Sequence, residues 1–523
     1  MSWSTLFEGN KDIISYSFIK DTKNNIYVSG TSDTNTIKIN EVEYKKTSEK
    51  TGGFITKLNE NGKIEWFKFI DGISLQSIYS VSIDTNNNSY ITGIASSNII
   101  IGTNQYNKPD ESASGFLIKF DKDGNVTWVK WINGSSIEYG YNTVIDSLND
   151  IYVVGASISP SINDSLPTRG LKSTTSSNTS TSTSTSNSAS TSTSTISRVD
   201  CAGYIIKFNP NGDTLWFKWI DGLRYDTAYT ITVDSKNNIY VSGSSNSPSL
   251  KIDDKEFTRM NTNESVYLTK ISKDGELEWF KWISGNNTDT VSKVIVDSND
   301  YVYLNGYSYS EYLTIDNINY PRIKDLSIDL SAAYIIRFNN DTVEWFNWVE
   351  GPIDIFSYTI NTDRVSNLYL CGTTNSEYII VNNRKYENKN KNYNSFMIKI
   401  NQKGKVEWNT WLYNNNISDN LTEIIISDLL IDNDFNIYFN VYTNAKSIYF
   451  NNEELLVSTN DTPALNTFIF KYSMKDLKFN NSILYILAMQ ITTHKKRIYT
   501  HLLNILLFII FIYSIWLLYK CVM

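Results

Sequence analysis

The chain has 523 residues, a formal net charge of −8 and a composition of 41% apolar and 14% aromatic residues. An acidic chain lacks the basic face that nucleic-acid binding needs, so we expect no nucleic-acid partner. Its three cysteines, Cys201, Cys371 and Cys521, are too few and too scattered for a disulfide framework or a zinc cluster. Its two histidines both lie beyond residue 490, which excludes histidine-based acid–base chemistry from most of the chain.

The first predicted element is a strand at residues 2–7, which carries a tryptophan and is followed by Gly9. Tryptophan then recurs at intervals of 62 to 66 residues, with a single interval of 88. Two more columns keep the same count, an aspartate and a tyrosine six residues after it. The three columns are Trp3, Trp66, Trp128, Trp216, Trp279, Trp345 and Trp408; Asp21, Asp84, Asp146, Asp234, Asp297, Asp363 and Asp432; and Tyr27, Tyr90, Tyr152, Tyr240, Tyr303, Tyr369 and Tyr438. Seven repeats follow from each column.

One repeat, residues 202–245, shows the elements of each unit. The segments YIIKF, TLWFKWI, AYTITV and IYVSG are predicted strands, and the turn NPNG places a glycine where positive φ is needed. Four short strands repeated seven times predict an all-β fold, a seven-bladed β-propeller of four-stranded blades. We expect AYTITV to be the innermost strand and TLWFKWI the outermost. Longer connections between the second and third strands carry small strand pairs such as residues 249–258.

These columns, together with a Tyr-x-x-Gly strand, resemble the seven-bladed β-propeller repeat family of the SBBP type. The resemblance covers roughly residues 1–480. It departs from the pattern in the last repeat, where Val441 replaces the glycine of the other six and Asn480 stands where tryptophan would fall. The family implies this fold but no single activity.

The long interval between Trp128 and Trp216 contains a Ser/Thr-rich low-complexity tract at residues 173–197. The tract accounts for nearly all of the excess length, so we interpret it as an insertion in a loop, either glycosylated or a disordered slippage sequence. The last confident strand, residues 468–472, has the sequence of a third strand. We therefore expect the N-terminal strand to complete the seventh blade and close the ring.

Beyond the propeller, residues 481–501 form a predicted juxtamembrane linker with a basic cluster at residues 495–497. Residues 502–519 are apolar apart from Asn504 and Ser514, long enough at about 1.5 Å per residue for a single transmembrane helix. Residues 520–523 are a short tail. Because positive charge is concentrated before the helix, we expect the propeller on the cytosolic side.

We interpret the repeated residues as structural. Each aspartate is expected to cap its own turn, each tryptophan to pack one blade on the next, and the repeated base to be a solvated strand residue. The bases are Lys57, Lys119, Lys207, Lys270, Arg337, Lys399 and Lys471. The segment Asp121–Gly124 starts like a calcium loop but has Ile132 where the loop needs glutamate. No catalytic, cofactor-binding or metal-binding residue is predicted.

The sequence favours a non-catalytic, membrane-anchored scaffold that binds a protein or glycan on the face of the long loops. A second interpretation is a structural or surface-display membrane protein, such as a viral envelope or host-membrane component. A third is a propeller enzyme acting on a polysaccharide or glycan, which would require carboxylates converging on the central channel.

Overall fold

The computed structural model of the chain describes residues 2–474 with gaps at 164–165, 170–199, 260, 262, 324–329, 390–391, 416–421 and 458–463. The chain divides into two units, Met1–Asp476 and Leu477–Met523, and the first contains every strand described below. The predicted insertion at 173–197, the linker at 481–501, the transmembrane helix at 502–519 and the tail at 520–523 lie outside the described residues. Among the residues that are described, no helix has the length and apolar character to cross a membrane.

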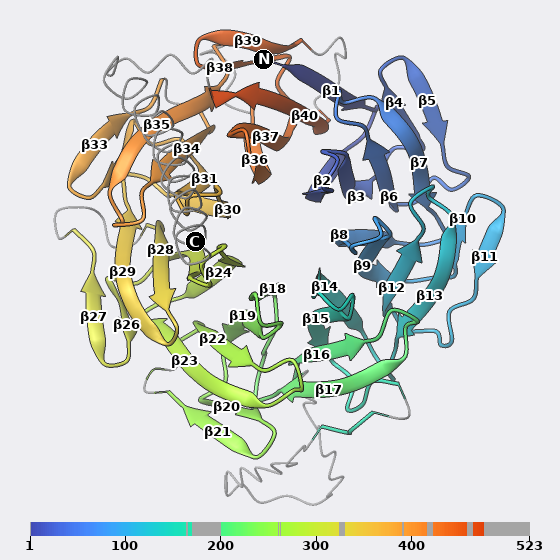
Figure 1. The fold of residues 1–523 in the computed structure, drawn as a ribbon, viewed down its shortest axis with the longest axis horizontal. Coiled ribbons are helices and arrows are strands. Elements are labelled where there is room, and N and C mark those ends of the chain that lie inside the picture. The colour runs from blue at the N-terminus through green and yellow to red at the C-terminus, as the bar shows by residue number, and fades with distance from the viewer. Residues whose placement is uncertain are drawn as a thin grey trace, which may run out of the picture. The chain divides into compact units, whose positions relative to one another are not determined.

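The first unit is an all-β propeller of seven blades, as predicted (Figure 1). The innermost strand of each blade faces the centre of the ring. These strands are β2 (Ile13–Lys20), β8 (Gln76–Ile83), β14 (Glu138–Ile145), β18 (Thr230–Val233), β24 (Asp289–Val296), β30 (Phe356–Thr362) and β36 (Ile424–Ile431). AYTITV therefore supplies an innermost strand, β18, as the sequence indicated.

The two middle strands of each blade are buried on both faces because each blade packs between two others. The second strands are β3 (Ile26–Ser32), β9 (Ser89–Ala95), β15 (Ile151–Ser157), β19 (Ile239–Ser245), β25 (Val302–Ser308), β31 (Leu368–Thr374) and β37 (Asn436–Thr443). The third strands are β6 (Gly52–Leu58), β12 (Ser114–Phe120), β16 (Ala202–Phe208), β22 (Ser265–Ile271), β28 (Ala332–Asn339), β34 (Asn394–Ile400) and β40 (Asn466–Ser473). The apolar core lies between blades; one cluster, for example, joins Ile55 of the first blade to Ile91 and Phe116 of the second.

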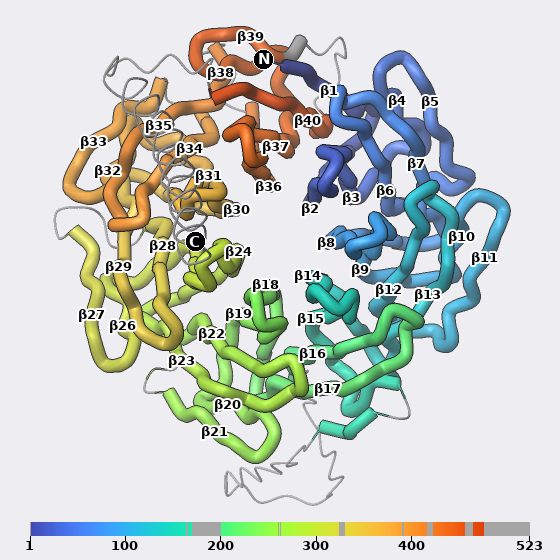
Figure 2. The backbone as a smooth tube through the Cα atoms, in the orientation of Figure 1, coloured from blue at the N-terminus to red at the C-terminus, as the bar shows by residue number. Residues whose placement is uncertain are grey.

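The outermost strands are β7 (Ile64–Ile70), β13 (Val126–Ile132), β17 (Thr214–Ile220), β23 (Leu277–Gly285), β29 (Thr342–Val349), β35 (Val406–Tyr413) and β1 (Trp3–Glu8). In the seventh blade β1 pairs antiparallel with β40, with Thr5 opposite Ile469. The two ends of the described chain therefore meet in one sheet, and the ring closes as the sequence predicted (Figure 2).

The connections between second and third strands contain short hairpins at the perimeter of the ring. They are β4–β5 (Thr36–Ile39, Val42–Lys45), β10–β11 (Ile99–Ile101, Asn104–Tyr106), β20–β21 (Ser249–Ile252, Lys255–Thr258), β26–β27 (Tyr312–Ile315, Ile318–Pro321), β32–β33 (Tyr378–Val381, Arg384–Glu387) and β38–β39 (Ser447–Phe450, Glu453–Val457). Each hairpin joins the outermost strand of the preceding blade, either as a strand pair or as a single bridge. Most of the long connections therefore hold neighbouring blades together (Figure 1). The free surface near them is the axial end of the ring, by which we mean the end of the central axis where the innermost strands begin.

Candidate functional site: a tyrosine arc on the innermost strands

The repeated aspartates hold the turns between first and second strands. Asp297 shows the pattern: its Oδ1 accepts hydrogen bonds from the backbone N–H groups of Asn299 (2.9 Å) and Tyr301 (3.0 Å), and its Oδ2 accepts one from the hydroxyl of Tyr303 (3.1 Å). Equivalent backbone bonds reach the other six aspartates. The tyrosines Tyr90, Tyr152, Tyr369 and Tyr438 also donate to the aspartate of their own repeat, whereas Tyr27 donates to the carbonyl of Asn87.

The repeated bases are not solvated, contrary to the sequence-based expectation. Lys57, Lys207, Arg337 and Lys399 are buried, and the cations lie over the rings of the repeated tyrosines, as Lys207 does over Tyr152 at 4.9 Å. Lys207 also lies 3.7 Å from Asp146 and 3.0 Å from Asp150. The expectation was wrong because the tyrosine of each repeat covers the base, and in four repeats the aspartate lies within 4.0 Å of it as well.

The repeated tryptophans contact the next blade. The indole of Trp3 packs on Gly62 and donates to the carbonyl of Glu60 at 2.8 Å. Trp66, Trp216 and Trp345 donate likewise to carbonyls in the turns of the following blades. None of these columns faces the centre of the ring, so the predicted repeat positions build the scaffold and leave recognition to other residues.

A different column does face the centre. In six innermost strands one extra residue forms a β-bulge, and in the shorter β18 the matching residue directly precedes the strand. This residue stands fourteen positions before the repeat glycine, or before Val441 in the last repeat. Its seven members are Tyr16, Tyr79, Tyr141, Tyr229, Ser292, Tyr358 and Ser427. Because bulges re-aim side chains, this column turns out of the sheet.

In six repeats a glycine stands opposite this position, whereas in the seventh Val441 does so and the bulge at Ser427 is kept. A Cβ at Gly155 would lie 1.8 Å from the carbonyl oxygen of Tyr139, and one at Gly30 would lie 2.1 Å from that of Ile14. Because glycine has no side chain, the two backbones approach closely at these positions. The carbonyl displaced in this way still has a partner in the third blade, where the hydroxyl of Tyr204 donates to Tyr139 at 2.8 Å.

The first four blades carry a continuous series of ring contacts, which we name the tyrosine arc: Tyr16, Tyr79, Tyr141 and Tyr229. Ring centroids are 6.0 Å apart for the first pair, 5.9 Å for the second and 5.5 Å for the third. Tyr139 stacks on Tyr141 at 5.4 Å, and the hydroxyl of Tyr225 hydrogen-bonds to Tyr141. The arc is thus an ordered aromatic surface rather than a set of separate side chains.

The arc is accessible although it lies deep in the ring. Tyr16 is 40% exposed and Tyr229 is 46% exposed, yet desolvation raises the pKa of both phenols, with a further increase in the pKa of Tyr16 from the phenol of Tyr229. Burial also raises the pKa of Tyr79 to about 12. Solvent contact combined with desolvation of the phenols is what a concave aromatic surface produces. The effect of Tyr229 in the fourth blade on the pKa of Tyr16 in the first indicates that the rings converge.

The opposite side of the ring is polar. Ser292 and Ser427 occupy the bulges of blades five and seven, with their hydroxyls bonded to backbone carbonyls. One residue further, Lys293 forms an ion pair with Asp428, and both bond to Thr359 at 3.1 and 2.8 Å. Each charge at this wall is therefore already neutralised by a neighbouring blade.

Four buried acidic side chains have a raised pKa, the usual mark of a catalytic acid or base: Glu350, which pairs with Arg322, and three others. Burial raises the pKa of Glu138, Asp226 and Asp289 to about 7 in each case. All three are inaccessible to solvent, and each is bound by two serine hydroxyls, as Asp226 is by Ser245 (2.6 Å) and Ser247 (2.9 Å). They fix the start of their blades and do not face a ligand. Within the described ranges, no group of three or more metal-ligating side chains occurs.

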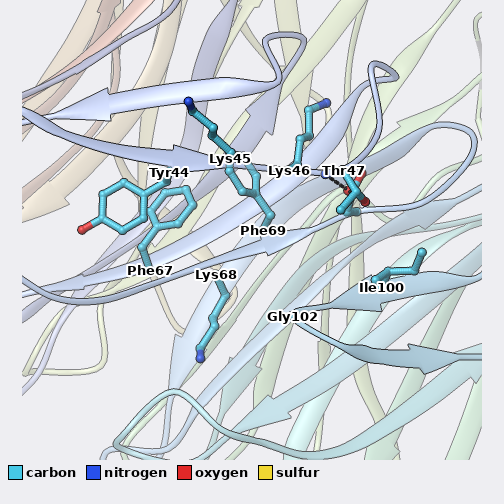
Figure 3. A pocket seen from close by; sticks show the side chains of 10 residues that line it. Tyr44, Lys45, Lys46, Thr47, Phe67, Lys68, Phe69, Ile100 and Gly102 are labelled. Atoms are coloured by element: carbon cyan, nitrogen blue, oxygen red, sulfur yellow. Dashed lines mark hydrogen bonds between the residues drawn. The ribbon is translucent and has the colours of Figure 1, made fainter.

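A shallow depression of about 250 Å³ lies at the perimeter between the first two blades, lined by Tyr44, Lys45, Lys46, Phe67, Lys68 and Gly102 among others (Figure 3). Tyr44 packs on Phe67 at 4.5 Å, as Phe257 packs on Phe280 in the fourth blade. Lys218 and Lys281 are the equivalents of Lys68 in other blades, and they pair with Asp253 and Asp316 in the turns of the neighbouring hairpins. In the hairpin next to Lys68, Gly102 stands in place of those aspartates. The depression is thus a contact between a hairpin and the preceding blade in which one side chain is missing.

Comparisons with known proteins agree with the fold. The model of the β-propeller repeat family SBBP matches residues 215–249. An uncharacterized WD repeat-containing protein of Acanthamoeba polyphaga mimivirus is 25% identical over 412 residues, which are 70% of this chain and 28% of that protein. The chain therefore spans well under two thirds of the length of that viral relative.

Solved structures resemble the chain more distantly. A protein of unknown function from Bacteroides caccae gives a TM-score of 0.31 at 13% identity, over 68% of this chain and 89% of its own. A polysaccharide lyase described as an ulvan lyase gives a TM-score of 0.40 at 10% identity, over 91% of this chain and 98% of its own. Similarity at this level concerns the fold and says nothing about activity.

Proposed function

We propose that the protein is a non-catalytic recognition module that binds a protein or glycan at the axial end of the ring, on the tyrosine arc. The observation that carries this proposal is the arc itself. It places partly exposed, mutually contacting aromatic rings on rigid innermost strands. Tyrosine offers a large apolar face and a polar tip, which suits it to binding surfaces. The innermost strands of a closed ring hold such side chains in fixed positions.

Exposed apolar side chains around the arc support the proposal that this surface binds a ligand. Ile73 and Leu75 lie on the connection into the second blade, Leu223 and Tyr225 on the connection into the fourth, and Ile353 on the connection into the sixth. Innermost strands begin where these connections end, so all five residues lie at the same axial end as the arc. Contiguous apolar groups rimmed by polar ones mark interaction sites.

The proposal is tested by binding of the full-length protein to peptide and glycan arrays. The variant Tyr16→Ala/Tyr79→Ala/Tyr229→Ala should lose the ligands that the wild type captures. The matched control, Leu148→Ala/Val365→Ala, removes exposed apolar side chains from the turns at the opposite axial end and should retain them. Circular dichroism and melting temperature establish that both variants fold. Ligand capture by the tyrosine variant at the wild-type level would exclude the arc as the binding surface.

We further propose that residues 502–519 anchor the propeller in a membrane and that the propeller is cytosolic. The support is the apolar sequence of this segment and the basic cluster that precedes it. Expressed in cells, the full chain should remain in the membrane pellet after extraction at pH 11, whereas a chain that ends at residue 480 should be released. Protease protection of the propeller inside sealed right-side-out vesicles would support the cytosolic side, and digestion from outside would contradict it.

A further inference from the structure

The chemistry of the axial end is more specific than an aromatic surface alone. Carboxylates surround the arc at the end where innermost strands begin. Asp12 and Glu423 directly precede β2 and β36, Asp33 directly follows β3, and Asp354 lies two residues before β30. All four are exposed or half-buried. Since neighbouring strands are antiparallel, the start of a first or third strand and the end of a second strand lie at one end of the ring.

Three of these carboxylates have no cationic partner among the described residues. Within the described part of the chain, neither Asp12, Asp354 nor Glu423 forms an ion pair with a lysine or arginine. After desolvation, the charged neighbours that raise the pKa of Tyr16 include Asp33 and Asp12. Those that raise the pKa of Tyr393, which reaches about 12, include Asp354 and Glu423. The tyrosines of this end thus lie in a negative potential.

Aromatic faces and carboxylates attract the same kind of group. The face of a tyrosine ring carries a negative quadrupole that attracts ammonium and guanidinium cations within about 6 Å of its centre. The carboxylates of the first, sixth and seventh blades at this end add a longer-range attraction that also speeds association. The chain already uses tyrosine and aspartate together to hold a cation in four repeats, as in the enclosure of Lys207 by Tyr152 and Asp146.

We propose that the tyrosine arc and its acidic surroundings bind a lysine or arginine side chain of a protein partner. The inference rests on the proposed function and specifies its ligand. An anionic ligand, nucleic acid included, would meet carboxylates of the same sign. A neutral glycan would stack on the rings but would leave the surrounding charges without a counter-ion. A cationic side chain satisfies both the rings and the carboxylates.

The test uses the full-length protein and surface-immobilised peptides GSGKGSG, GSGRGSG, GSGQGSG and GSGEGSG, with cellohexaose and chitohexaose as neutral glycan probes. The lysine and arginine peptides should bind at least tenfold more tightly than the glutamine and glutamate peptides. Binding should weaken as salt is raised from 50 to 500 mM, because exposed charges are screened.

Four variants test the contributions of the carboxylate charge and of the tyrosine ring separately. Asp12→Asn/Asp354→Asn/Glu423→Gln should weaken binding of the cationic peptides about tenfold or more. Its matched control, Asp123→Asn/Asp274→Asn/Asp341→Asn, changes the net charge equally in turns at the opposite end and should bind as the wild type does. Tyr229→Phe keeps the ring face and should retain most of the affinity, whereas Tyr229→Leu should lose it.

The outcomes distinguish the two proposals. Cellohexaose or chitohexaose could bind with an affinity that is lost in Tyr229→Phe and unchanged in Asp12→Asn/Asp354→Asn/Glu423→Gln. This result would overturn the proposal of a cationic ligand and leave the proposal of a recognition module standing. Equal binding of all four peptides would overturn the cationic ligand as well. No binding of any peptide or glycan, on these surfaces and on the arrays, by a protein that melts normally would overturn both.

Discussion

Trp3 lies opposite Lys471 in the antiparallel pair of β1 and β40, and its indole also donates to the carbonyl of Glu60 in the next blade. One residue near the N-terminus therefore joins the last blade and the first. Deletion of residues 1–9 should remove a strand ladder and a large aromatic contact together. We expect a loss of several kcal/mol, since a buried aromatic such as Phe7 alone contributes about 3–5 kcal/mol, and a tendency to self-associate through the free edge of β40.

Urea unfolding and light scattering of the deletion variant measure both effects. The point variant Trp3→Phe is the control, because it keeps the strand and most of the ring while losing the indole hydrogen bond. It should remain monomeric and lose about 1 kcal/mol. A deletion variant as stable and as monomeric as the full chain would show that the ring closes without β1.

The hydrogen-bonded turn that recurs in each repeat can be tested at Asp297. Asp297→Ala removes the acceptor of two backbone N–H groups and one buried tyrosine hydroxyl. We expect a loss of about 3 kcal/mol, since bonds to a charged group contribute about 1.5–3 kcal/mol each and do not add fully. Asp316→Ala removes a carboxylate that is half exposed and paired with Lys281, and should cost less than about 1 kcal/mol. Equal losses in the two variants would contradict the capping role.

Stability should depend on pH through Asp226. Burial raises the pKa of this carboxyl to about 7, against about 3.9 in an unfolded chain. The folded state therefore holds the proton more tightly, so this contribution to stability is fully present below about pH 4 and is lost as the pH rises through 7. The lost contribution is about 4 kcal/mol.

Melting curves between pH 5 and pH 8 provide the measurement. The wild type should melt at lower temperature at pH 8, and Asp226→Asn, which cannot ionise, should show a smaller decrease. Asp253→Asn, on an exposed turn, controls for the change in net charge and should keep the wild-type dependence. A slope unchanged in Asp226→Asn would mean that this carboxyl is ionised in the folded protein at both pH values.

The propeller itself was predictable because a closed ring repeats its contacts. The tryptophan, aspartate and tyrosine columns each recur seven times, and the sequence of β40 indicated that β1 completes its blade. The repeated base was misjudged, because alternation along one strand says nothing about side chains that approach from another, as Asp146 and Tyr152 do toward Lys207. The sequence also did not show that hairpins such as Ser249–Ile252 return to the preceding blade.

The tyrosine arc was missed although a signal was present. A tyrosine stands fourteen residues before the repeat glycine in five of seven repeats, with serine in the other two. Period-two alternation assigns that position to one face of a regular strand. It cannot show that a bulge rotates the residue toward the centre, because the bulge depends on the register with the neighbouring strand.

The Ser/Thr tract at residues 173–197 should be dispensable for the ring. The third blade is complete around it, with β15 and β16 paired from Ile151↔Phe208 to Ser157↔Ala202. Shortening a long loop changes the entropy of closing it only slightly, so a deletion of residues 173–197 should shift the melting temperature by no more than a few degrees. A larger decrease in differential scanning calorimetry would show that the tract contributes to folding.

The repeat glycines affect both the packing of the blades and the position of the tyrosine arc, and both effects can be tested at Gly155. A Cβ at this position would lie 1.8 Å from the carbonyl oxygen of Tyr139 and 2.5 Å from the hydroxyl of Tyr204, so Gly155→Ala must push β14 and β15 apart. We expect a loss of about 2 kcal/mol or more, typical of strain in a packed interior. Because Tyr141 forms the bulge opposite, the arc should be displaced in the third blade as well. Gly115→Ala, where the nearest atoms would lie at 3.3 Å, is the matched control and should cost less than about 1 kcal/mol. Urea unfolding gives the first comparison, and the near-ultraviolet circular dichroism of the tyrosines gives the second. A Gly155→Ala protein with wild-type stability and an unchanged tyrosine spectrum would contradict the dependence of the bulge on this glycine.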